Sequence, residues 1–276
     1  MLDVDLHCHS NLSDGVLDPA VLAARAHAHG VRLWALTDHD ELGGIPAARA
    51  AALEAGMRYV CGVEISISWA GETVHILGLQ IDPQNQLLRQ GLAHTRHGRL
   101  ARAEEMAALL AQAGVPDALA GARRYASNPQ LLGRTHFARY IVERGLCAKV
   151  SEVFQKYLTE GKPGYVPHRW ASMEQALQWI HAAGGQAVVA HPGRYKYSTL
   201  AEAEMLQCFK DMGGAGIEVV TGSHSVEQYA HYANMAQHYG FLASAGSDFH
   251  APGESRVDLG QLPAMPPGVK PIWHDW

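Results

Sequence analysis

The sequence predicts an α/β fold in which parallel strands close into a barrel. Short apolar segments alternate with segments of helical pattern along most of the chain. The apolar segments lack regular polar alternation, as expected for parallel strands that are buried on both faces. Histidine or carboxylate residues stand at the ends of several of these segments, and such positions converge on one rim when parallel strands form a barrel. The 276 residues suffice for one barrel or for two modest domains.

The strand and helix signals follow one another in a βα order. Asp18 and Pro19 predict a helix start, and Gly30 predicts its end. Further helices are expected over 46–55, 172–183, 200–212 and 226–239. Seven strands are expected, over residues 4–7, 32–37, 57–66, 73–79, 185–190, 216–220 and 241–246. The third and fourth strands could pair with each other.

A stretch without strand signals interrupts this order. Helices are expected over 87–113, 135–144 and 151–159, with turn signals between them. We therefore predict a helical subdomain over 84–165, inserted into a barrel that is formed by 1–83 and 166–276.

Composition excludes several classes of protein. The mean hydropathy is −0.11, and no apolar run approaches the roughly 18 residues needed to cross a bilayer. Asp3 and Asp5 interrupt any signal-peptide pattern, so the cytoplasm is the expected location. A net charge of −5 disfavours broad nucleic-acid binding. Four cysteines without paired spacing predict no disulfide framework, and nothing indicates an obligate protein partner.

Spacing of histidines and acids predicts a metal site. His7 and His9 are two residues apart on a strand, so both imidazoles project from one face, with Asp14 in the following loop. Asp248 and His250 repeat this spacing after the last strand. The other candidate ligands at strand ends are His39, Glu64, His75 and His191. Imidazoles and carboxylates on one rim are suited to divalent metal ions.

Three acids at or beside these strand ends carry more specific expectations. Glu64 ends an apolar strand, where an isolated carboxylate would be costly, and we expect it to bridge two ions. Asp38 and Asp40 flank His39 and are expected either to orient neighbouring imidazoles or to cap the loop. Most histidines outside these motifs, including His224, are expected to face solvent.

Together the motifs resemble those of the polymerase and histidinol phosphatase (PHP) family of metal-dependent phosphoesterases. They are D-x-H-x-H-S from Asp5, T-D-H-D from Thr37, G-x-E from Gly62, A-H-P from Ala190 and G-S-D-x-H from Gly246. The resemblance implies a distorted (β/α)7 barrel of the TIM type with two or three divalent ions, most often Mn²⁺, with Zn²⁺, Fe²⁺ or Mg²⁺ as alternatives. It assigns one ion to His7, His9, Glu64 and Asp248, a second to Glu64, His75 and His191, and a third to Asp14, His39 and His250. Glu64, His191 and Asp248 are expected to act directly in catalysis.

The insertion narrows the resemblance to a stand-alone subgroup that acts on nucleoside 3′,5′-bisphosphates or on 5′ ends of RNA. This implies a phosphatase that uses hydroxide generated between the ions to convert the bisphosphate to nucleoside 5′-monophosphate and phosphate. The alternatives are a 5′-to-3′ exonuclease on short RNA or DNA, an amidohydrolase and an inactive binding module. Residues expected to hold substrate phosphate are Arg99, Arg102, Arg134, Thr135, Lys162 and Arg194, each of which could instead be an ordinary surface residue. Tyr165 or His168 could contact a base.

Overall fold

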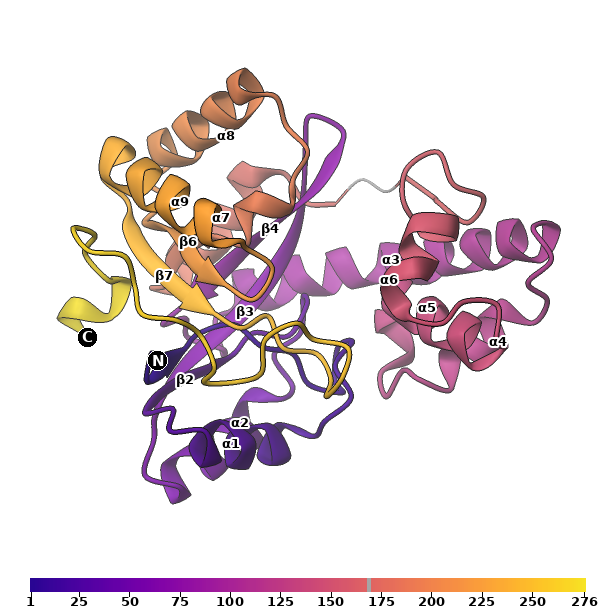
Figure 1. Cartoon of the computed structure of the whole chain (residues 1–276), viewed down its shortest axis with the longest axis horizontal. Coiled ribbons are helices and arrows are strands. Elements are labelled where there is room, and N and C mark those ends of the chain that lie inside the picture. Colours follow the sequence, from indigo (N-terminus) through magenta and orange to yellow (C-terminus); the bar gives the residue numbers. More distant parts are fainter. Residues whose placement is uncertain (168–169) are drawn as a thin grey trace.

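The barrel is confirmed in a computed structural model that describes residues 1–167 and 170–276 (Figure 1). Seven strands pair in the order of the sequence. They are β1 Val4–Asp5, β2 Leu33–Leu36, β3 Arg58–Trp69, β4 Glu72–Leu79, β5 Gln186–Val189, β6 Gly216–Thr221 and β7 Leu242–Gly246. The N–H of Leu6 donates to Ala245 O at 3.0 Å, and the N–H of Asp248 to His7 O at 2.8 Å. These bonds bring β1 against β7 and close the barrel.

One strand departs from the expected parallel arrangement. β4 runs antiparallel to both β3 and β5, whereas the other neighbouring strands are parallel. Ala70 and Gly71 connect β3 to β4 in a two-residue hairpin, and both have positive φ values, 47° and 86°, as a tight hairpin turn requires. As a result the N-terminal half of β4, with His75, lies at the rim formed by the C-terminal ends of the parallel strands.

Helices cover the outside of the barrel. They are α1 Pro19–Ala28, α2 Ile45–Glu54, α7 Met173–Ala182, α8 Thr199–Asp211 and α9 Val226–Tyr239. Asp18 accepts a hydrogen bond from the N–H of Ala20 at the start of α1, which agrees with the helix signal in the sequence. Ser172 and Ser225 cap α7 and α9 in the same way, each with a glutamine that completes a capping box.

The predicted insertion forms a separate lobe beside the barrel (Figure 1). It contains α3 Gln86–Gln112, α4 Ala118–Arg123, α5 Arg134–Glu143, α6 Val150–Val153 and a π-helical turn Phe154–Leu158. α3 belongs to both parts, because Leu88 and Leu92 pack in the barrel core, whereas Met106 and Leu110 pack in the core of the lobe. At Gly91 a Cβ atom would lie 2.3 Å from the indole of Trp179, so α3 crosses α7 at close range there. The domain boundaries at residues 84 and 165 remain a prediction.

Candidate metal centre

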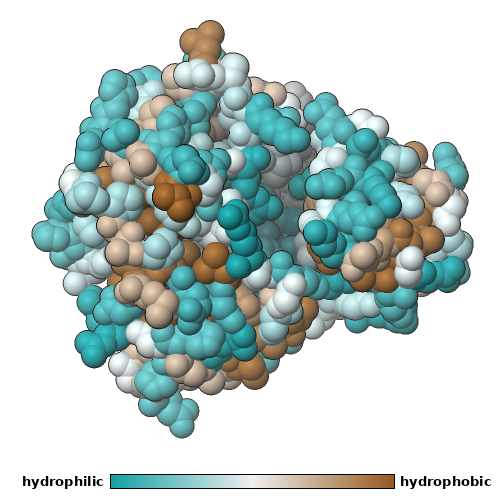
Figure 2. Space-filling view, in the orientation of Figure 1, coloured by the Kyte–Doolittle hydropathy of each residue, from teal (hydrophilic) through white to brown (hydrophobic). Residues whose placement is uncertain are grey.

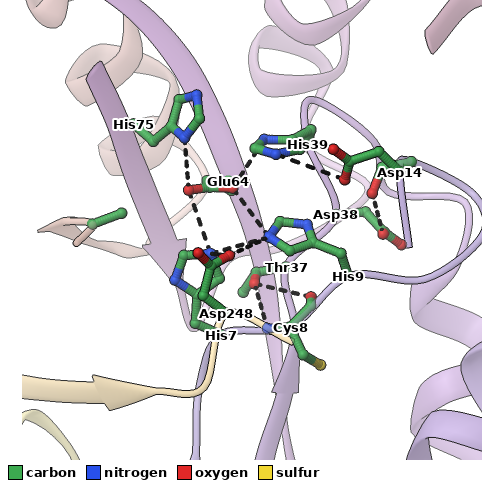
Figure 3. A network of polar contacts seen from close by, with 12 residues as sticks. His7, Cys8, His9, Asp14, Thr37, Asp38, His39, Glu64, His75 and Asp248 are labelled. Carbon is green, nitrogen blue, oxygen red and sulfur yellow. Dashed lines mark hydrogen bonds and ion pairs between the residues drawn. The ribbon is translucent and has the colours of Figure 1, made fainter. Parts of the chain in front are cut away.

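The nine candidate ligands come together at one rim of the barrel. Four overlapping groups of them have possible ligand atoms within 4.8 Å of one another. The groups are His7, His9 and Asp248; His7, Glu64 and His191; His39, Glu64 and His75; and His9, Asp14, His39 and His250. Residues from both ends of the chain therefore meet in one cluster, and Figure 3 shows most of them.

The Glu64 carboxylate lies at the centre of this cluster (Figure 3). Five imidazole nitrogens surround it at 2.9–3.3 Å, from His7, His9, His39, His75 and His191. Burial alone would raise the pKa of this carboxyl, but the imidazoles of His39, His75 and His7 hold it well below its usual range. Glu64 is therefore an anion that faces two groups of nitrogen ligands, as a bridging ligand would.

The spacing of the nitrogens fits divalent metal ions. His7 Nε2 and His9 Nε2 are 3.2 Å apart, and His75 Nδ1 and His191 Nε2 are 3.3 Å apart. Two ligand atoms at about 2.1 Å from one ion, at ordinary coordination angles, would lie about 3.0–3.4 Å apart. Asp14 Oδ1 and Glu64 Oε2 are buried and lie 3.3 Å from His250 Nε2 and 2.9 Å from His39 Nδ1, but neither contact has the alignment of a hydrogen bond. Cations in these positions would satisfy them.

The remaining ligand candidates lie at the edge of the cluster that faces the inserted lobe. Asp14 Oδ1 is 3.3 Å from His250 Nε2 and 3.8 Å from His39 Nε2. Asp248 Oδ1 is 3.2 Å from His9 Nε2. These distances are compatible with the expected grouping, and the assignment of residues to individual ions remains a prediction.

Glu218 orients two of these histidines, and the sequence analysis missed it. Its Oε1 is 2.9 Å from His7 Nδ1, and its Oε2 accepts the backbone N–H of His191 at 2.6 Å. Glu218 is fully buried in β6. A lone acid in an apolar strand was the signal that identified Glu64, and the same signal is present here.

Asp38 and Asp40 have other partners. Asp38 accepts hydrogen bonds from the N–H and Oγ of Ser10 and from Ser13 Oγ at 2.6–2.7 Å, so it caps the loop that carries Asp14. Asp40 accepts the N–H of Ser66 at 2.9 Å and forms an ion pair with Arg99. The loop-capping expectation is thus correct for Asp38, and neither acid contacts an imidazole in the described structure.

His224 holds the loop that follows His191. Its Nε2 accepts the N–H of Gly193 at 3.0 Å, its Nδ1 donates to Val219 O at 3.1 Å, and Gln228 donates to Gly193 O at 3.1 Å. The expectation that His224 faces solvent is wrong, because only 2% of it is exposed. Burial lowers the pKa of His224 to about 4, so this imidazole is neutral at physiological pH.

A cleft that is partly open to solvent joins the cluster to the inserted lobe. Figure 2 shows the surface hollowed between the barrel and the lobe, with hydrophilic side chains along the hollow. Its lining combines Asp14, His39, His75 and His250 with Arg99, Arg102, Arg134, Thr135 and Arg194. Five of the six predicted substrate contacts are therefore here. Lys162 does not line the cleft, nor does Tyr165, and His168 lies outside the described residues.

The four arginines of the cleft differ in their partners. Arg99 pairs with Asp40, and Arg194 Nη1 donates to Asp248 Oδ2 at 2.8 Å. By contrast, Arg102 donates to Val166 O at 3.0 Å and Arg134 to Leu158 O at 3.5 Å, and neither has a carboxylate partner among the described residues. Burial, together with Arg134 and Arg99, lowers the pKa of Arg102 to about 9. Two neighbouring cations without counter-charges favour the binding of an anion.

Comparison with known proteins identifies the family, because residues 5–219 match the PHP domain. The chain belongs to the PHP family. A 3′,5′-nucleoside bisphosphate phosphatase of Chromobacterium violaceum is 48% identical over 275 residues, covering 100% of this chain and 96% of that protein. The 5′-3′ exoribonuclease Rnm of Salmonella typhimurium is 41% identical and covers 99% of this chain and 93% of its own.

Solved structures agree with this assignment. A Chromobacterium violaceum protein described as an amidohydrolase, with bound sulfate and no metal, is 48% identical with a TM-score of 0.96, over 99% of this chain and 95% of that one. A Bifidobacterium adolescentis protein proposed to be a metal-dependent phosphoesterase is 27% identical with a TM-score of 0.81, over 98% and 92% of the two chains. The protein is a phosphoesterase with a candidate metal-binding cluster. Within the described residues, no helix combines the length and apolarity needed to cross a membrane.

Glu218→Gln should weaken metal binding about 10- to 100-fold, because an amide cannot accept hydrogen bonds through both of its terminal atoms. Mn²⁺ titration of the metal-free protein measures this, with Glu202→Gln as the control, since Glu202 pairs with Tyr232 and His231 and with none of the candidate ligands among the described residues. Unchanged Mn²⁺ affinity in folded Glu218→Gln would exclude the orienting role.

His224 should make the fold sensitive to acid. With a folded pKa of about 4 against an ordinary value of 6.5, the neutral form is favoured by the fold. The unfolded chain gains a proton as pH falls below 6.5, so this residue lowers the free energy of unfolding by about 2 kcal/mol between pH 7 and pH 5. In denaturant unfolding of His224→Gln, the free energy of unfolding should fall by about 2 kcal/mol less between pH 7 and pH 5 than it does in the wild type. The exposed His238→Gln should keep the full dependence, and equal slopes in both variants would contradict the prediction.

Proposed function

We propose that this protein is a phosphatase for small nucleotides that removes the 3′-phosphate of a nucleoside 3′,5′-bisphosphate. The products are the nucleoside 5′-monophosphate and inorganic phosphate. One observation carries the proposal: the uncompensated guanidinium groups of Arg102 and Arg134 line the same cleft as the metal-binding cluster. A substrate with two separate phosphates matches both halves of this cleft.

Divalent ions, with Mn²⁺ proposed, would be held by His7, His9, Asp14, His39, Glu64, His75, His191, Asp248 and His250. When bound, such ions lower the pKa of water and offset charge on the reacting phosphate. Two of these imidazoles are held neutral: burial, with His250 and His39, lowers the pKa of His9 to about 3, and burial, with Arg194, does the same for His191. Nearby carboxylates instead outweigh burial and raise the pKa of His7, His39 and His250, so these three must lose a proton to bind metal. Neutral imidazole is the form that ligates metal.

The second phosphate would lie on Arg102 and Arg134. Arg99 and Arg194 are less available, because each already pairs with a carboxylate. Trp170 fixes the direction of Arg99 and Arg102, whose guanidinium carbons lie 4.5 and 5.4 Å from the centre of its ring. Thus the inserted lobe would bind the phosphate that does not react, and the barrel the one that does. The cytoplasm, which holds small nucleotides, is the proposed location.

A second candidate function is a 5′-to-3′ exonuclease acting on short RNA or DNA. The relative at 41% identity is named a 5′-3′ exoribonuclease, and the cleft is partly open to solvent. An amidohydrolase is the weaker candidate. One solved structure of a relative carries that description, but Glu64 occupies the proposed bridging position, and the 48% and 41% identical curated relatives are named for phosphoester chemistry.

Adenosine 3′,5′-bisphosphate should be hydrolysed with at least tenfold higher kcat/KM than adenosine 3′-monophosphate in the presence of Mn²⁺. The reason is the added charge-assisted contact of the 5′-phosphate, of about 1.5–3 kcal/mol. Phosphate release measures both reactions, EDTA should abolish them, and Mn²⁺ should restore them. Equal efficiency on the two compounds would contradict the second-phosphate site, and a parallel assay on 5′-phosphorylated oligoribonucleotides reports the alternative.

Arg102→Ala and Arg134→Ala should each raise KM for the bisphosphate about 10- to 100-fold, with a smaller change in kcat. KM for adenosine 3′-monophosphate should change little, since that compound lacks the 5′-phosphate. Arg123→Ala, an exposed arginine of α4, is the matched control. Identical KM changes for both substrates would exclude these arginines from the second-phosphate site.

A further inference from the structure

Helix α5 of the inserted lobe contacts the loop that carries Asp14. Thr135 Oγ1 donates to Asp14 Oδ2 at 2.9 Å, which leaves Asp14 Oδ1 directed at His250 and His39. One turn further along α5, Arg139 Nη1 donates to the backbone carbonyl of Asp14 at 2.7 Å. Both the side chain and the backbone of this candidate ligand are therefore held by α5.

Arg139 also ties α5 to the segment after His250. Its Nε is 3.1 and 3.2 Å from the two oxygens of Glu254, and its Nη2 is 2.9 Å from Glu254 Oε2. Ser255, the next residue, accepts the backbone N–H of His250 through its Oγ at 2.8 Å. The Arg139 side chain is only 5% exposed and that of Glu254 is 30% exposed, so solvent reaches this bidentate pair from the Glu254 side only.

Asp14 and His250 belong to the candidate metal group that also contains His9 and His39. Asp14 comes from an irregular loop near the N-terminus, and His250 comes from a loop near the C-terminus. Two backbone bonds join these segments: the N–H of Val16 donates to His250 O, and the N–H of His9 donates to Phe249 O, both at 2.9 Å. Arg139 adds a side-chain connection between the two loops, and it comes from the insertion.

We propose that α5 assembles this edge of the metal centre. Arg139 and Thr135 are positioning residues for the group Asp14, His39 and His250, so that an ion binds there tightly only when the inserted lobe is docked on the barrel. The inference rests on the proposed function in one respect, namely that these residues ligate metal. It goes further in making the lobe a part of the metal centre as well as a binding surface for substrate.

Ion binding and docking of α5 must be coupled in both directions. If docking of α5 favours the ion, then the ion must favour docking of α5 by the same free energy. The backbone amides of α5 should therefore exchange more slowly with solvent once this ion is bound. A merely structural Arg139–Glu254 pair would stabilise α5 to the same degree with and without metal.

The test compares Mn²⁺ binding by metal-free wild type, Glu254→Gln and Thr135→Val, without substrate. Isothermal titration should show that the weakest Mn²⁺ site of the wild type weakens at least tenfold in both variants, while tighter sites are unchanged. Thr135→Ser should restore the wild-type value, because it keeps the donor to Asp14. Glu143→Gln is the matched control, since Glu143 is also on α5 and the substitution affects only its exposed contacts with Arg124 and Tyr125.

Hydrogen exchange of α5 provides the second readout on the same samples. Mn²⁺ should slow exchange in wild type and Glu143→Gln, and have little effect in Glu254→Gln. Equal Mn²⁺ affinities in wild type, Glu254→Gln and Thr135→Val would overturn the inference but leave the proposed function standing. Absence of Mn²⁺ binding by the wild type would instead refute the metal centre itself, and with it both proposals.

Discussion

The arrangement of the barrel depends on one buried anion. Glu64 is inaccessible to solvent, and an isolated carboxylate in that position would cost several kcal/mol. Its charge is balanced by imidazoles that reach it from the ends of β1, β2, β4 and β5. The effect is mutual at His7. Burial alone would lower the pKa of this imidazole, but the acids Glu218, Glu64 and Asp248 hold it well above its usual range. Protons or metal ions can therefore compensate the same acids, and metal binding must displace protons.

The reversed direction of β4 follows from this requirement. In a strictly parallel barrel, the N-terminal half of the fourth strand would lie at the rim opposite the cluster. The two-residue turn at Ala70 and Gly71 reverses the chain, so His75 lies across from Ser66 in the hairpin and reaches the Glu64 carboxylate at 3.0 Å. The hairpin replaces a helical crossover here.

The sequence was sufficient for the strand positions and for gathering the nine candidate ligands, because strand ends in a barrel converge whatever lies between them. It was insufficient where the partner of a residue decides its role. Asp38 and Asp40 have the same local sequence signal, yet one caps a loop and the other pairs with Arg99, 59 residues away. The direction of β4 left only the short turn at Ala70 and Gly71 as a signal, and the pair of Arg139 with Glu254, 115 residues apart, left no local pattern. Glu218 did leave one, a charged residue in an apolar strand.

The two activities named among the relatives require nearly the same chemistry. A 5′-phosphorylated RNA end carries a 5′-phosphate and, on the same ribose, a phosphate esterified at O3′. A nucleoside 3′,5′-bisphosphate is that end without the following nucleotide, and cleavage at O3′ yields a nucleoside 5′-monophosphate in both cases. A clamp formed by Arg102 and Arg134 would hold the 5′-phosphate of either substrate. The arginines and the metal ligands therefore cannot distinguish a phosphatase from an exonuclease. The residues that do so must contact the nucleotide that follows the cleaved bond, on the side of the metal cluster away from these arginines.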